Sequence, residues 1–134
     1  MAFEAVDRPG DQAIKHEKNK RTVVLIEPDV SVKDALTLLL EGEGWPVRSL
    51  SGCRELDDAI GQEDILAVIS ESSLPGCKPQ EILELCSEND IPVVFTGHEL
   101  SLQGAVDLIR QGALDFLDKP FPQSRLLDLL QRLN

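Results

Sequence analysis

The chain has 134 residues, which is the size of one domain with a hydrophobic core of its own. Hydrophobic residues make up 42% and charged residues 28% of the sequence, and these fractions exclude collagen-like, disulfide-framework and fully disordered chains. Lys and Arg number 13 against 24 Asp and Glu, so the formal net charge of −11 predicts that this domain by itself binds neither nucleic acid nor an anionic membrane surface.

The N-terminal segment differs in composition from the rest of the chain. Residues 1–21 hold few apolar side chains and end in a basic cluster, which predicts a flexible N-terminal tail, with a short helix over 11–20 as the alternative. The segment lacks the features of a secretory signal, and no apolar run approaches the ~20 residues of a membrane span. The odd cysteine count, Cys53, Cys77 and Cys86, has no CxxC spacing, so these residues are predicted to be reduced in a cytoplasmic protein.

From residue 22 onward, two apolar patterns alternate along the chain. Continuous apolar runs over residues 22–26 and 65–69 predict two strands that are buried on both faces, and shorter runs predict three further strands. Apolar residues at helical spacing predict amphipathic helices. The second helix would be capped by Ser51 and end at Gly61, and the third would begin at Pro79. The predicted strands cover residues 22–26, 47–50, 65–69, 92–95 and 114–117, and the helices carry their apolar residues within 32–40, 56–60, 82–86, 102–109 and 126–133.

The order of these elements is a strand followed by a helix, repeated five times. Such alternation implies a parallel sheet with helices on both faces. Right-handed crossovers then favour a doubly wound α/β domain with a five-stranded, flavodoxin-like sheet in the strand order 2-1-3-4-5. There is no GxGxxG or Walker A lysine motif, so the sequence gives no local support for binding a dinucleotide or a nucleoside triphosphate.

In open α/β sheets the functional site lies at the carboxyl ends of the strands. Acidic groups, a hydroxyl and a lysine are expected to converge there, where they could hold a cation and an anionic group together. His98 has no second His or Cys at metal-ligand spacing and is predicted to be a loop residue. The segments that follow four of the strands are Glu27-Pro28-Asp29, Ser70-Glu71, Thr96-Gly97-His98 and Asp118-Lys119-Pro120-Phe121.

Residues 22–134 resemble the receiver domain of a two-component response regulator, which has the chemotaxis-receiver fold. The resemblance rests on the segments Val94–His98, Gln111–Phe121 and Ile69–Gly76. In that family, an aspartate at the end of the third strand takes a phosphoryl group from a histidine kinase, and an acidic pair after the first strand helps to hold Mg²⁺. The resemblance implies that Thr96 is the hydroxyl that binds phosphoryl oxygens, Lys119 the phosphoryl-site lysine, Phe116 the switch aromatic residue and Lys119-Pro120 the usual cis peptide bond.

Two positions depart from the family pattern. Glu71 stands at the phosphoacceptor position in place of Asp, and its carboxylate is one methylene further forward; a ~1 Å misplacement can cost ~10²-fold in rate. The acidic pair reads Glu27-Pro28, and Pro28 offers no side-chain oxygen to Mg²⁺, while Asp29 lies one residue out of register. We therefore expect no metal and no cofactor, with weak Mg²⁺ binding at Glu27 and Glu71 if any, and no ordinary phosphorylation.

Three interpretations of Glu71 stay open at this point. It imitates the phosphorylated acid, with its charge reaching Lys119 and Thr96; it is a relic of lost chemistry; or it still accepts phosphate or binds metal weakly. The first hypothesis for the function is a non-enzymatic, atypical receiver that acts as a phosphorylation-independent interaction module and could be constitutively active. The alternatives are a conventional receiver phosphorylated by a histidine kinase with Mg²⁺ and, as a minor one, a flavodoxin-like small-ligand-binding protein.

The resemblance also implies where partners bind. In the family, the fourth helix, fifth strand and fifth helix form an interaction face, so a protein partner or a second copy of the chain is expected there. In this sequence, the face corresponds to the predicted elements around 102–109, 114–117 and 126–133. A histidine kinase is a further possible partner.

Overall fold

The computed structural model describes residues 21–98 and 102–133. The tail predicted over residues 1–21 lies outside these ranges except for Arg21, so it stays a prediction. The strands are β1 (Thr22–Ile26), β2 (Val47–Leu50), β3 (Ile65–Glu71), β4 (Val93–Gly97) and β5 (Asp115–Asp118). The helices are α2 (Val30–Gly42), α3 (Leu56–Gln62), α4 (Pro79–Glu88), α5 (Leu102–Arg110) and α6 (Gln123–Gln131), and a 3₁₀ turn, η1 (Cys53–Glu55), leads into α3.

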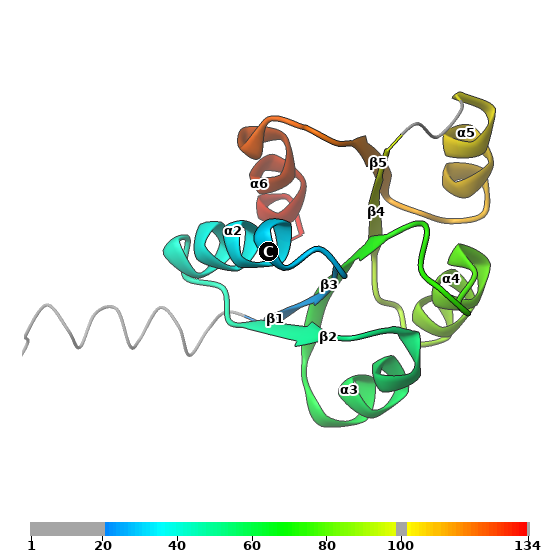
Figure 1. Ribbon diagram of the computed structural model, residues 1–134. Coiled ribbons are helices and arrows are strands. Elements are labelled where there is room, and N and C mark those ends of the chain that lie inside the picture. Colours follow the sequence, from blue (N-terminus) through cyan, green and yellow to red (C-terminus); the bar gives the residue numbers. More distant parts are fainter. Residues whose placement is uncertain (1–20, 99–101, 134) are drawn as a thin grey trace, which may run out of the picture.

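The strands form one parallel sheet in the order β2-β1-β3-β4-β5, as the sequence predicted. Helices α2 and α6 cover one face, and α3, α4 and α5 cover the other (Figure 1). The central strand β3 is buried at all 7 of its positions, which explains its continuous apolar sequence. The doubly wound α/β fold predicted from the alternating patterns is therefore confirmed.

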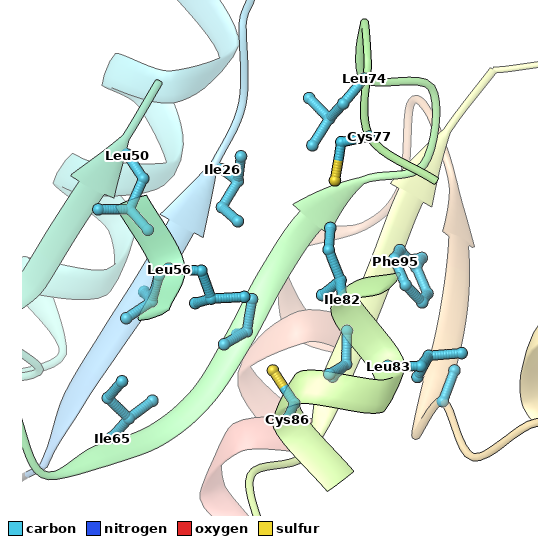
Figure 2. Close-up of a cluster of buried hydrophobic side chains, with 14 of the residues drawn as sticks. Ile26, Leu50, Leu56, Ile65, Leu74, Cys77, Ile82, Leu83, Cys86 and Phe95 are labelled. Atoms are coloured by element: carbon cyan, nitrogen blue, oxygen red, sulfur yellow. The ribbon is translucent and has the colours of Figure 1, made fainter. Parts of the chain in front are cut away.

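Each face of the sheet has its own aliphatic core, because successive residues of a strand point to opposite faces. On one face, Val24 and Phe95 pack with residues of α3, α4 and α5. Figure 2 shows part of this cluster, with Ile82 and Cys86 of α4 directed toward the sheet. On the other face, Leu25 and its neighbours pack with residues of α2 and α6. The two cores fix the sheet between its helices and hold the carboxyl ends of the strands in register.

Local details differ from the sequence predictions around α3. Ser51 does not cap this helix; instead, its backbone N–H donates a hydrogen bond to the Glu55 carboxylate at 2.6 Å, and the chain enters α3 through η1. The helix continues through Gly61 to Gln62, because a glycine lowers helix stability without preventing the helical conformation. Both errors lie in a short helix, where local signals compete with packing.

The prediction that all three cysteines are reduced is wrong for two of them. Cys53 and Cys77 form a disulfide, with their Cα atoms 6.2 Å apart. Their separation of 24 residues places them in two loops that only the fold brings together, so neither the odd cysteine count nor the spacing could reveal the pair. Cys86 is free and buried in the core, and burial raises the pKa of its thiol to about 12.

Candidate functional site

The polar residues predicted at the strand ends do meet at one edge of the sheet. The register pairs Ile26 with Ser70, Glu71 with Thr96, and Gly97 with Asp118, so the residues that follow β1 and β5 lie level with the end of β3. Among them, the buried polar residues include Glu27, Glu71 and Thr96, which are 4%, 8% and 1% exposed.

At the centre of this edge, a lysine bridges two carboxylates. The Lys119 ammonium donates hydrogen bonds to Glu27 Oε1 at 2.5 Å and to Glu71 Oε1 at 2.7 Å. The side chains of Lys119, Glu27 and Glu71 are 7%, 2% and 10% exposed. Two carboxylates and one ammonium leave one net negative charge in a nearly dry environment. We call these three residues the buried ion triad.

The two outer carboxylate oxygens of the triad also have donors. Glu27 Oε2 accepts the backbone N–H of Asp29 at 3.0 Å. Glu71 Oε2 accepts the backbone N–H of Ser73 at 3.1 Å and lies 3.5 Å from the Ser72 hydroxyl. Every carboxylate oxygen of the triad is therefore hydrogen-bonded, which is the condition under which buried charges are tolerated.

These contacts keep both Glu71 and Lys119 charged. Burial by itself raises the pKa of Glu71, but the hydrogen bonds from Lys119 and from the backbone of Ser73 and Ser72 outweigh it, and the pKa lies below its ordinary value. Burial by itself lowers the pKa of Lys119, but its hydrogen bonds to Glu27 and Glu71 outweigh that effect and raise the pKa. Glu71 and Lys119 therefore both stay charged across the neutral pH range.

Thr96 is buried in β4 and lies beside Glu71 in the sheet register. Its backbone carbonyl accepts the N–H of Ser72 at 2.8 Å, which closes the end of β3 against β4. Within residues 21–98 and 102–133, no hydrogen bond joins the Thr96 hydroxyl to Glu71. The Glu71 carboxylate instead accepts hydrogen bonds from Lys119, Ser72 and Ser73, so the roles predicted for the Thr96 hydroxyl stay predictions.

Gly97 lies close to both Glu71 and Phe116. Phe116 is 8% exposed and belongs to the core shared with α3, α4 and α5. A Cβ atom added at Gly97 would lie 2.6 Å from Ser72 Oγ, 3.2 Å from Phe116 Cζ and 3.3 Å from Glu71 Oε2. Gly97 therefore leaves space that Glu71, Ser72 and Phe116 occupy, a role that the sequence did not reveal; a glycine directly after Thr96 was the available signal.

Asp29 does not join the acidic pocket predicted for it. Its Oδ1 caps α2 by accepting the backbone N–H groups of Ser31 and Val32 at 2.9 and 3.2 Å, and the residue is exposed. A cap of this kind satisfies helix N–H groups that have no partner within the helix. Only the backbone N–H of Asp29 reaches the triad. The Lys119–Pro120 peptide bond that follows the triad lysine is cis.

The residues at this edge do not fit a magnesium ion. Mg²⁺ needs several oxygen ligands in near-octahedral geometry. Here the Lys119 ammonium already lies between Glu27 and Glu71, the outer oxygens of both carboxylates accept hydrogen bonds, and Pro28 supplies no side-chain oxygen. Among the described residues, the sole cluster of three potential metal ligands lies elsewhere, at Cys53, Cys77 and Glu81.

Comparisons with known proteins agree on one family. The family described as "Response regulator receiver domain" matches residues 23–131. The chain is 38% identical over 113 residues to the C4-dicarboxylate transport transcriptional regulatory protein DctD of Pseudomonas aeruginosa, covering 82% of this chain and 24% of DctD. It is 29% identical over 115 residues to the transcriptional regulatory protein FixJ of Bradyrhizobium diazoefficiens, covering 84% of this chain and 56% of FixJ. The chain thus spans only part of the length of these relatives.

Solved structures share the fold. The signal receiver domain of a putative LuxO repressor protein from Vibrio parahaemolyticus superposes with a TM-score of 0.76 at 25% identity, over 85% of this chain and 92% of that one. The beryllofluoride-activated NtrC4 receiver domain dimer has a TM-score of 0.77 at 24% identity, over 84% of this chain and 94% of that one. In the part of the chain that the structure describes, no helix is long and apolar enough to cross a bilayer.

Proposed function

The chain belongs to the receiver domain family of two-component response regulators, and from this premise we propose that it is an atypical, phosphorylation-independent receiver. It transmits signals by binding other proteins and has no enzymatic activity of its own. Glu71 occupies the phosphoacceptor position and imitates the phosphorylated acid. The family match leaves the flavodoxin-like ligand-binding alternative without support.

The observation that carries this proposal is the hydrogen bond of 2.7 Å from Lys119 Nζ to Glu71 Oε1. In ordinary receivers the equivalent lysine binds phosphoryl oxygens. Here the carboxylate of Glu71 itself delivers a negative charge to Lys119, and the extra methylene of Glu carries that charge forward of an aspartate. Phe116 is 8% exposed and lies close to Gly97 and Glu71, and this proximity supports the proposal that Glu71 sets the position of the aromatic residue without phosphorylation.

Two features of this site oppose phosphoryl transfer to Glu71. Both oxygens of the Glu71 carboxylate accept hydrogen bonds, and Glu71 shares its lysine with Glu27, so the negative charge that would attack a phosphoryl group is partly neutralised. The Mg²⁺ ion that would neutralise an incoming phosphoryl group lacks a complete set of ligands, because proline stands at position 28 where the family has a carboxylate. These two features support phosphorylation-independence over the conventional alternative.

The binding face we propose is formed by α5, β5 and α6. Three large apolar residues are exposed on α5 and just before β5: Leu102, Ile109 and Leu114, at 81%, 45% and 40%. Phe116 and Lys119 belong to β5 and to its end, so this face is directly connected to the ion triad. The partner is a protein or a second copy of the chain, in the cytoplasm, with a histidine kinase as a further candidate.

The test is intact mass spectrometry after incubation with acetyl phosphate and Mg²⁺, with an amide-shift titration of Mg²⁺ by NMR in parallel. We expect an unchanged mass and no site-localised shifts at Glu27 and Glu71. A stoichiometric phosphoryl adduct would establish the conventional receiver instead.

A matched pair of variants tests the role of Pro28. Glu71→Asp together with Pro28→Asp is expected to gain Mg²⁺-dependent shifts and a phosphoryl adduct, because it restores both the acceptor and the missing ligand. Glu71→Asp alone is expected to gain neither. A single variant that binds Mg²⁺ as well as the double variant would contradict the role given to Pro28.

A further inference from the structure

The disulfide between Cys53 and Cys77 joins two loops at the same edge of the sheet as the ion triad. Cys53 opens η1, in the connection between β2 and α3, and Cys77 lies in the loop between β3 and α4. Figure 2 shows Cys77 next to Leu74 in this second loop, above the core residues of α4. The family match and the proposed function assign no role to either cysteine.

The surroundings of the pair give a small thiol reagent access to one sulfur. A cavity of about 400 Å³ beside Cys53 is lined by both loops, including Gly52, Arg54 and Gly76. Cys53 is partly exposed, whereas Cys77 is 7% exposed. An incoming reagent would therefore meet Cys53 first, and Cys77 would act as the second, resolving thiol.

A metal site is a weaker interpretation of the same cluster. Glu81 lies near both sulfurs, but its Oε1 accepts the backbone N–H of Lys78 at 2.8 Å as part of the α4 cap. Three ligands are also one fewer than a structural zinc site requires. Moreover, two sulfurs bonded to each other cannot both be thiolate ligands.

We propose that Cys53 and Cys77 form a reversible thiol–disulfide site that exchanges with low-molecular-weight disulfides and thiols such as glutathione. In oxidation, the Cys53 thiolate attacks one sulfur of oxidised glutathione and releases one glutathione thiolate, which takes up a proton. The Cys77 thiolate then attacks Cys53 Sγ, closes the Cys53–Cys77 bond and releases the second glutathione. The pair loses two electrons and two protons, and one oxidised glutathione becomes two reduced ones.

This site is coupled to the ion triad through the loop that begins at Glu71. Ser72 and Ser73 donate to Glu71 Oε2, and the same loop reaches Cys77 after Leu74, whose carbonyl accepts the Cys77 N–H at 3.3 Å. Oxidation ties the far end of this loop to η1, so it restrains the Ser72 hydroxyl and the Ser73 N–H, which donate to the Glu71 carboxylate. The coupling rests on the proposed role of Glu71, whereas the redox pairing does not.

The pairing is tested on the full chain in mixtures of reduced and oxidised glutathione, followed by unfolding, alkylation and intact mass. Of the 3 cysteines, we expect all to be alkylated at the reducing end and Cys86 alone at the oxidising end, with a peptide map showing the Cys53–Cys77 link. The Cys86→Ser variant should keep the transition, and Cys53→Ser should abolish it. A link that never forms, a link that no thiol removes from the folded protein, or one zinc ion retained per chain would each overturn the proposal.

The coupling has its own readout. Amide spectra of the reduced and oxidised chain are expected to differ at Glu71, Ser72 and Ser73 as well as around the two cysteines. Differences confined to the neighbours of Cys53 and Cys77 would overturn the coupling and leave the redox pairing standing. Because the mass assay needs no signalling partner, failure of the redox site and failure of the proposed function are distinguishable.

Discussion

Replacing Lys119 by Met removes the only cation of the buried ion triad. Methionine keeps the length of the apolar stem, but the carboxylates of Glu27 and Glu71 then face each other without the ammonium that lies 2.5 and 2.7 Å from them. Breaking a buried ion pair by removing one partner costs about 3–5 kcal/mol, because it leaves an uncompensated charge in a dry site. Domains of this kind have a total stability of only about 5–15 kcal/mol. We expect the free energy of unfolding, measured in urea at pH 7, to fall by about 3–5 kcal/mol.

The effect of Lys119→Met on stability should also depend on pH. In the native protein the pKa of Glu71 is lowered from 4.5, so its stabilisation is present above that value and lost as the pH falls through the lowered pKa. The pKa of Lys119 is raised from 10.5, so its stabilisation is present below that value and lost as the pH rises through the raised pKa. In the variant, burial and like charge raise the pKa of one carboxylate. The folded variant then binds more protons than the unfolded chain, so the stability deficit shrinks as the pH falls from 7 toward 5.

Lys33→Met is the matched control, because Lys33 is half-buried on α2 and makes no ion pair with any residue in the described ranges. Lys and Met have similar helix propensities, so this change should stay within about 0.5 kcal/mol. A loss below about 1 kcal/mol for Lys119→Met, with no dependence on pH, would show that the triad behaves as a hydrated surface pair. That result would refute the argument from burial.

Three further predictions concern the same edge and the proposed binding face. Glu71→Gln leaves Lys119 paired with Glu27, so it should lower the free energy of unfolding by about 1.5–3 kcal/mol and change amide chemical shifts as far as α5. Shift changes confined to immediate neighbours would support the interpretation of Glu71 as a relic of lost chemistry. Gly97→Ala should cost about 1–3 kcal/mol through its contact with Ser72 Oγ, and Ser72→Ala should relieve part of that cost in urea unfolding. Charge reversal at Arg110 of α5 together with Arg125 of α6 should weaken self-association by about tenfold, or 1.4 kcal/mol, in sedimentation measurements. Unchanged self-association would contradict the proposed face.

The sequence by itself determined the architecture of this protein. Apolar strand patterns that alternate with helical patterns five times leave few alternatives to a parallel sheet, because each pattern reports which faces of an element are covered. The carboxyl ends of parallel strands lie at one edge, so Glu27, Glu71, Thr96 and Lys119 could be placed together before any contact was known. Local patterning was sufficient for these conclusions because the spacing of apolar residues along the chain shows which faces of each strand and helix are buried.

The tertiary structure alone decided which of these side chains touch. Lys119 is 92 residues from Glu27 and 48 from Glu71, and its hydrogen bonds to both carboxylates depend on how the strand ends are placed in three dimensions. Asp29 appeared to belong to the same pocket, yet the unpaired N–H groups at the start of α2 draw its carboxylate away. The link from Cys53 to Cys77 likewise joins two loops on either side of β3. Such pairings are set by how the elements pack, and no periodicity along the chain encodes them.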